Sequence, residues 1–279
     1  MRYAALVVLA LASLGTAPAV VHAQGADTEW DVLNKEVVEL YRAGEYDRAV
    51  VVAQKALQVA EQNVGPDHPD VAQSLNNLAA LYYTQSEYAK AEPLYQRALG
   101  IREKALGPDH PDVAQSLNNL AALYVIQGEY AKAEPLYQRA LGIREKALGP
   151  DHPDVAQSLN NLALLYGNQG EYAKTEPLYQ RSLAILEKAL GPDHPDVATS
   201  LNNLALLYDS QGEYAKAEPL HQRSLAILEK ALGPSHPNVA TALENLAALY
   251  RATDRESEAE AMEKRAAAIH AIIETCVSK

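Results

Sequence analysis

The sequence predicts an all-α fold, an α-solenoid of about six helix-turn-helix units, from three observations. The segment GPDHPDVAQSLNNLA begins at Gly65, Gly107 and Gly149, each copy 42 residues after the last, and looser copies begin at Gly191 and Gly233. Apolar residues recur at helical spacing within each copy. Gly-Pro pairs separate the copies, at places where helices commonly end. A fixed period of this length is typical of a solenoid, whose units bury their apolar faces against one another.

Residues 1–23 have the layout of a secretory signal peptide. Arg2 supplies the positive start, residues 4–14 are apolar, and Val21 and Ala23 stand at the usual cleavage spacing. The apolar stretch is shorter than the about 20 residues that span a bilayer. We therefore expect cleavage after Ala23 and an exported chain, periplasmic or secreted, without membrane insertion after cleavage. An uncleaved anchor is the alternative.

The repeats divide the rest of the chain into units. Residues 24–64 form a degenerate N-terminal cap, which keeps LYRAGEYDRAV but carries Trp30 and additional acids. Regular units follow at 65–106, 107–148, 149–190 and 191–232, and residues 233–279 form a C-terminal cap and tail. In this last unit Glu256 and Glu263 replace tyrosines. The end units differ because an end unit has water where an inner unit has a neighbour.

Each regular unit is predicted to be two amphipathic helices. In residues 65–106 the apolar positions are Val71, Leu75, Leu78 and Tyr82 in the first helix and Tyr88, Ala91, Tyr95, Ala98 and Ile101 in the second. Pro69 fits the first turn of the first helix, where its missing N–H costs nothing. Gly128, Gly170 and Gly212 mark the turn between the two helices, and Ser86 takes their place in the first regular unit.

Prolines recur inside the predicted second helices, at Pro93, Pro135, Pro177 and Pro219. An interior proline removes a helix hydrogen bond and costs about 3 kcal/mol. We expect a tolerated bend in every unit.

The spacing of the apolar positions resembles the tetratricopeptide repeat (TPR), through Leu75, Leu78, Ala79, Tyr82, Ala91, Tyr95 and Ala98 and their equivalents in later units. The 42-residue period, LNNLA and EYAKAEPLYQRAL resemble the kinesin light chain subtype and its bacterial relatives, over about residues 29–272. The resemblance implies a right-handed superhelix whose first helices line a concave, peptide-binding groove. It implies no catalytic residue. The cytoplasmic motor attachment of the namesake is not carried over, because the signal peptide directs the chain elsewhere.

Two rows of asparagine are the main candidate site, and the resemblance places them toward the groove. The inner row is Asn77, Asn119, Asn161, Asn203 and Asn245, and the adjacent row is Asn76, Asn118, Asn160 and Asn202. An asparagine amide can pair with both the C=O and the N–H of an extended peptide backbone. The alternative for the inner row is bonding between neighbouring helices or turns, and for the adjacent row a solvated helix surface.

The near-identical copies differ at the end of the first helix. Tyr83 and Thr84 in one unit become Val125 and Ile126 in the next. We hypothesise that Tyr83, Val125 and Ile126 form an apolar pocket. The same hypothesis makes Asp209 with Arg251 a charged end, so that a ligand is read unit by unit. Unselected drift after duplication is the alternative.

Charge and composition argue against several other functions. A net charge of −12 argues against nucleic acid or an anionic membrane as the main partner. The repeated histidines, such as His68, stand too far apart in a stack of units to share a metal ion, so we expect loop or cap roles. The single Cys276 is a tail residue or the link of a homodimer. We expect no cofactor.

The predicted function is a non-enzymatic scaffold or adaptor that binds an extended segment of another protein. No Ser/His/Asp set, phosphate-binding loop or paired carboxylate indicates an enzyme. The alternative is a passive structural or self-assembling repeat array without a dedicated peptide ligand.

Overall fold

The computed structural model describes residues 28–277, and the side chains of residues 28–273. The predicted signal peptide and the side chain of Cys276 lie outside this part. The described residues form helices and turns without a strand, which confirms the all-α prediction. The helices are α1 (Glu29–Arg42), α2 (Tyr46–Val64), α3 (Pro69–Thr84), α4 (Tyr88–Leu106), α5 (Pro111–Ile126), α6 (Tyr130–Leu148), α7 (Pro153–Asn168), α8 (Tyr172–Leu190), α9 (Pro195–Ser210), α10 (Tyr214–Leu232), α11 (Pro237–Ala252) and α12 (Glu256–Val277).

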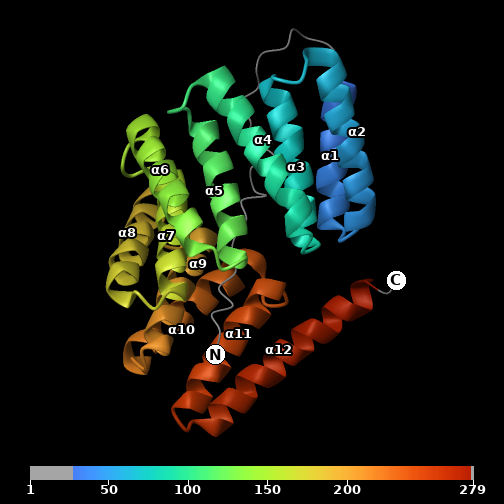
Figure 1. Cartoon of the computed structure of the whole chain (residues 1–279). Helices are drawn as coiled ribbons and strands as arrows, with labels where there is room; N and C mark the ends of the chain where they lie inside the picture. Colours follow the sequence, from blue (N-terminus) through green and yellow to red (C-terminus); the bar gives the residue numbers. More distant parts are fainter. Residues whose placement is uncertain (1–27, 278–279) are drawn as a thin grey trace. The chain divides into compact units, whose positions relative to one another are not determined.

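The helices pair into six hairpins, three in each of two compact units. The N-terminal unit comprises α1–α6, up to Gly149, and the C-terminal unit comprises α7–α12. The two helices of a hairpin lie side by side (Figure 1). Within the N-terminal unit α2 packs on α3 and α4 on α5, and within the C-terminal unit α8 packs on α9 and α10 on α11. No helix among the described residues is both long enough and apolar enough to cross a bilayer.

Histidine caps start the first helices of the regular hairpins. The Nδ1 atom of His68 accepts a hydrogen bond from the backbone N–H of Asp70 at 3.2 Å, and proline occupies the first turn. The same cap occurs at His110, His152, His194 and His236. A side-chain acceptor at this position satisfies one of the N–H groups that a helix start leaves unpaired. These histidines therefore have a capping role.

Backbone conformation explains why glycine recurs at the same positions of the repeat. Gly107 ends α4 with φ of 89°, and Gly128 forms the turn between α5 and α6 with φ of 76°. L-residues other than glycine rarely adopt this left-handed region. Ser86 and Asp254 nevertheless adopt it, with φ of 62° and 59°, at the positions that correspond to Gly128. Two of the six hairpin turns are therefore strained.

Small and aromatic residues fill the core of each hairpin. Tyr95, Tyr137 and Tyr179 are fully buried, together with leucines and alanines of the first helices. Where later copies place Ser182 and Ser224 at buried alanine positions, each hydroxyl donates to a carbonyl of the neighbouring first helix, at 2.9 Å and 2.8 Å. These two hydroxyls therefore lie in the core with a hydrogen-bond partner.

The second helices remain continuous through their interior prolines. Pro93 is exposed, and the carbonyl that it leaves without a helical donor belongs to Ala89, which is also exposed. Water can therefore hydrate that carbonyl, which compensates part of the loss. The bend expected at these prolines stays a prediction.

Exchanging residues between equivalent turns tests the strain. Ser86→Gly should raise the free energy of unfolding by about 0.5–1 kcal/mol, because relief of left-handed strain outweighs the greater freedom of glycine in the unfolded chain. Gly128→Ser should lower it by a similar amount. The measurement is urea unfolding of both variants. Shifts of the same sign in both would contradict the strain argument.

Candidate functional site

We define the amide face as the asparagine rows on the first helices, and describe it separately in each unit. In the N-terminal unit it comprises Asn76 and Asn77 on α3 and Asn118 and Asn119 on α5. Asn76 is only 5% exposed, and Asn77 and Asn118 are likewise buried. Asn119 is half-buried and reaches the surface. The sequence pattern does not separate these two environments.

Hydrogen bonds occupy much of the amide face in the N-terminal unit. Asn77 accepts from Gln73 Nε2 at Oδ1 and donates from Nδ2 to Asn34 Oδ1 on α1, both at 2.9 Å. Asn119 accepts from Gln115 Nε2 at 2.9 Å. Asn77 therefore joins two hairpins, whereas the Nδ2 group of Asn119 makes no hydrogen bond within the described part of the chain.

The amide face of the C-terminal unit is more open. Asn160 and Asn161 on α7, Asn202 and Asn203 on α9, and Asn245 on α11 are all half-buried. Asn245 Nδ2 donates to Asn202 Oδ1 at 2.8 Å, which repeats the link between Asn77 and Asn34. Asn161 and Asn203 make no hydrogen bond to any described residue. Their amides remain available to a ligand.

A buried arginine lies behind the amide face of the N-terminal unit, and the sequence analysis missed it. Arg102 on α4 is 5% exposed. It donates to the backbone O of Asp112 at 3.1 Å, to Ser116 Oγ at 3.0 Å and to Gln73 Oε1 at 2.9 Å. Burial lowers the pKa of the Arg102 guanidinium, and the charge of Asp112 opposes that shift. Arginine at a position that holds Ala60 and Leu186 in other copies was the available signal.

The residues proposed as an apolar pocket differ in exposure. Tyr83 is half-buried and meets the ring of Tyr88 edge to face, with centroids 5.6 Å apart. Val125 is buried in the core, whereas Ile126 is 48% exposed. Among these three side chains, Ile126 offers most of the accessible apolar surface.

The two variable charged positions pair within their own hairpins. Asp209 Oδ2 lies 2.8 Å from Nε2 of the buried His221. Arg251 donates to both carboxylate oxygens of Glu263, at 2.7 Å and 2.8 Å. Each pair joins residues twelve positions apart, so a change at the end of the first helix is matched on the second helix. Intramolecular partners therefore already occupy the charges expected to form a charged end.

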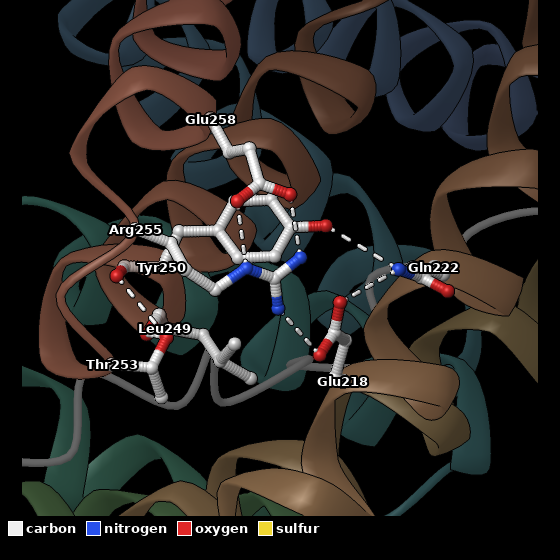
Figure 2. Close-up of polar contacts among 7 residues, drawn as sticks. All are labelled: Glu218, Gln222, Leu249, Tyr250, Thr253, Arg255 and Glu258. Atoms are coloured by element: carbon white, nitrogen blue, oxygen red, sulfur yellow. Dashed lines mark hydrogen bonds and ion pairs between the residues drawn. The ribbon is translucent and has the colours of Figure 1, made fainter.

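The last hairpin shows the same matching at its contact with the preceding hairpin (Figure 2). In the inner copy, Lys216 lies over the ring of Tyr208, whose hydroxyl donates to Glu176 at 2.7 Å. In the last copy Arg255 stacks on Tyr250 at 4.2 Å instead. Figure 2 shows Arg255 between two carboxylates, donating to Glu218 at 2.8 Å and to Glu258 at 2.6 and 2.7 Å. The residue that supplies the positive charge thus differs between the two copies, but in both a cation lies over the tyrosine ring.

No metal site is evident among the described residues, which contain no cluster of three His, Cys, Asp or Glu side chains suited to an ion. The chemical groups that the amide face presents are its hydrogen-bonding side chains and the carboxylates at the starts of its helices.

Comparison with known families identifies the repeat. The sequence profile of the tetratricopeptide repeat family matches residues 38–104, 85–146, 112–174, 154–230 and 210–271. Comparison with curated protein sequences gave no match.

Solved structures share the fold. BtubC (BKLC) from P. vanneervenii is 28% identical, with a TM-score of 0.66 over 89% of this chain and 93% of that chain. A P. anserina kinesin light chain protein with nearly identical TPR-like repeats is 29% identical, with a TM-score of 0.61 over 74% and 98%. A Rap protein complexed with competence and sporulation factor is 16% identical, with a TM-score of 0.63 over 88% and 76%. The kinesin light chain-like repeat is thus confirmed.

Burial raises the pKa of Tyr83 to about 12, whereas an unfolded tyrosine ionises near 10. Below about pH 10 the Tyr83 hydroxyl is protonated in both the folded and the unfolded chain, so its contribution to the free energy of unfolding is fully present there. That contribution is lost as the pH rises through about 12. Tyr83→Phe should make the decline in urea midpoint shallower over this interval. The decline that remains in this variant should come from Tyr95 and Tyr137, whose pKa values burial also raises. An unchanged pH profile in Tyr83→Phe would contradict this assignment.

The pair of Asp209 and His221 can be tested against another copy of the same chain, which has Gly167 and Tyr179 at these positions. His221→Tyr should destabilise the chain because the larger phenol crowds the Asp209 side chain, whereas the copy with Tyr179 has the small Gly167 at that position. Adding Asp209→Gly should restore stability, with a coupling free energy of about 0.5–3 kcal/mol in a double-mutant cycle. Additive effects in thermal unfolding would show that the two residues are independent.

Proposed function

Because the chain belongs to the tetratricopeptide repeat family, we propose that it is a non-enzymatic adaptor that holds an extended segment of another protein against its amide face. Proteins built from this repeat commonly mediate protein–protein interactions. The observation that carries the proposal is the set of half-buried asparagines whose amides are not used up within the chain. These are Asn119 in the N-terminal unit and Asn161 and Asn203 in the C-terminal unit.

Amide chemistry suits an extended backbone. A primary amide offers two donors and an acceptor, so one asparagine can pair with a peptide C=O and a peptide N–H. Such contacts read the backbone and tolerate variation in side chains. Each hydrogen bond contributes about 0.5–1.5 kcal/mol net, and several together give micromolar binding if the ordering cost of the segment is modest.

The N-terminal sequence supports a separate proposal about the compartment of the interaction. We propose that residues 1–23 direct export and that the partner is another exported protein. Tracking the tagged chain in cell fractions, with and without residues 1–23, tests that step separately from binding.

The binding test uses the chain from Gln24 and its Asn119→Ala, Asn161→Ala, Asn203→Ala triple variant. A linear peptide library and the host's exported fraction are the probes. The triple variant should lose roughly tenfold or more in affinity for captured ligands, because it removes three backbone contacts. Its melting temperature should stay within about 3 °C of the parent, since these amides make few internal bonds.

A matched control removes three other amides, with Gln58→Ala, Gln62→Ala and Asn63→Ala on the exposed face of α2. This variant should bind as the parent does. Equal losses in both variants, or a melting decrease that matches the affinity loss, would make the asparagines structural. Absence of any ligand would instead favour the passive array.

A further inference from the structure

One buried serine recurs at the same position of α3, α5, α7 and α9, and its hydroxyl oxygen can accept a hydrogen bond. In α3, Ser74 Oγ accepts from Trp30 Nε1 at 2.8 Å. In α5, Ser116 Oγ accepts from Arg102 Nη1 at 3.0 Å and from Asn76 Nδ2 at 3.3 Å. In α11 the hydroxyl is absent, because Ala242 stands at this position.

Ser200 in α9 departs from this pattern. It is fully buried, and its Oγ makes no hydrogen bond within the described part of the chain. Leu186 takes the place of Arg102 behind it. The neighbouring Asn160 Oδ1, on α7, is shielded from solvent and lacks a donor, as do its equivalents Asn76 Oδ1 and Asn118 Oδ1, so the unpaired hydroxyl of Ser200 is what sets this copy apart. Buried polar groups without a partner are rare and costly in native structures.

The missing group is a guanidinium. In the N-terminal unit the guanidinium of Arg102 bonds Ser116 and the backbone O of Asp112. In the C-terminal unit Ser200 and Asp196 hold those two positions, and Leu186 stands at the position of the arginine. The acceptor set therefore persists without its cation.

We propose that the C-terminal unit binds an arginine side chain of the partner's extended segment, between α7 and α9, at Ser200 and Asn160. This inference rests on the proposed function. The incoming guanidinium replaces the internal one, donates to Ser200 Oγ and Asn160 Oδ1, and packs against Leu186. Asp196 lies one turn before Ser200 on α9, and its 64% exposed carboxylate complements the positive charge.

Access favours this unit, and the charge of its first helices does not oppose binding. Asn160 is half-buried, whereas its equivalent Asn76 is buried in the N-terminal unit. Thr199 next to Ser200 is exposed. The α7 and α9 sequences contain no lysine or arginine, so these helices carry no positive charge that would repel the ligand. Because Ser200 is fully buried, the proposal requires the Asn160 amide to shift when the ligand binds.

The test measures binding of three glycine- and serine-flanked peptides that differ only in a central arginine, lysine or alanine. Fluorescence anisotropy with the chain from Gln24 should give roughly tenfold tighter binding of the arginine peptide than of the alanine peptide. The lysine peptide should fall between them, because an ammonium lacks the planar set of donors.

Two variants assign the preference to this site. Leu186→Arg places an internal guanidinium as in the N-terminal unit and should abolish the arginine preference, whereas Leu186→Met should keep it. Ser200→Ala should reduce the preference without lowering the melting temperature, because it removes an unpaired hydroxyl. Circular dichroism checks that each variant is folded.

The converse variant is Arg102→Leu, which recreates the acceptors of the C-terminal unit in the N-terminal unit. It should add a second arginine-dependent binding event. An arginine preference that survives Leu186→Arg would overturn the inference. Equal affinity for all three peptides, with binding that still depends on Asn119, Asn161 and Asn203, would overturn it and leave the proposed function standing. Binding that depends on neither set would overturn both.

Discussion

Burial of a first helix between two second helices, as for α3, α5, α9 and α11, is the constraint on which each unit depends. A hairpin cannot bury both faces of its first helix by itself, so α3 packs on α4 within its hairpin and on α2 of the hairpin before. A given position of the repeat therefore meets equivalent neighbours in successive hairpins of a unit. This regularity makes one copy a physical control for another, because a substitution at one position changes a contact whose original form survives elsewhere in the chain.

Some polar contacts repeat from one unit to the other. Asn77 reaches Asn34 and Asn245 reaches Asn202 across the same hairpin-to-hairpin contact, 43 residues apart in both cases. Where a copy changes, its partner changes with it, as for Asp209 with His221 and Arg251 with Glu263. The first pair includes the fully buried His221, where an unpaired polar group is costly, whereas Arg251 and Glu263 are both exposed and pair at the surface.

The sequence predicted the helices, their hairpins and the capping glycines, because these depend on spacing and backbone conformation that each copy displays locally. It also predicted which residues share a helix face. It did not predict which asparagines are already bonded, because the partner of Asn77 lies in another hairpin and depends on how the two hairpins align. For the same reason Arg102 was missed, and the charges of Asp209 and Arg251 were assigned to a ligand although each has a partner twelve residues later.

The distribution of donors behind the amide face bears on how such a repeat acquires selectivity. Trp30 donates a hydrogen bond to the hydroxyl of Ser74, and Arg102 donates one to the hydroxyl of Ser116. At the equivalent position of α11, Ala242 has no hydroxyl that would need a donor. Each of these states is self-sufficient. Ser200 is not, since its hydroxyl is buried without a donor. Alanine at this position, as in α11, leaves no hydroxyl to satisfy. The proposed guanidinium of a ligand would supply the donor that the chain itself does not offer to Ser200.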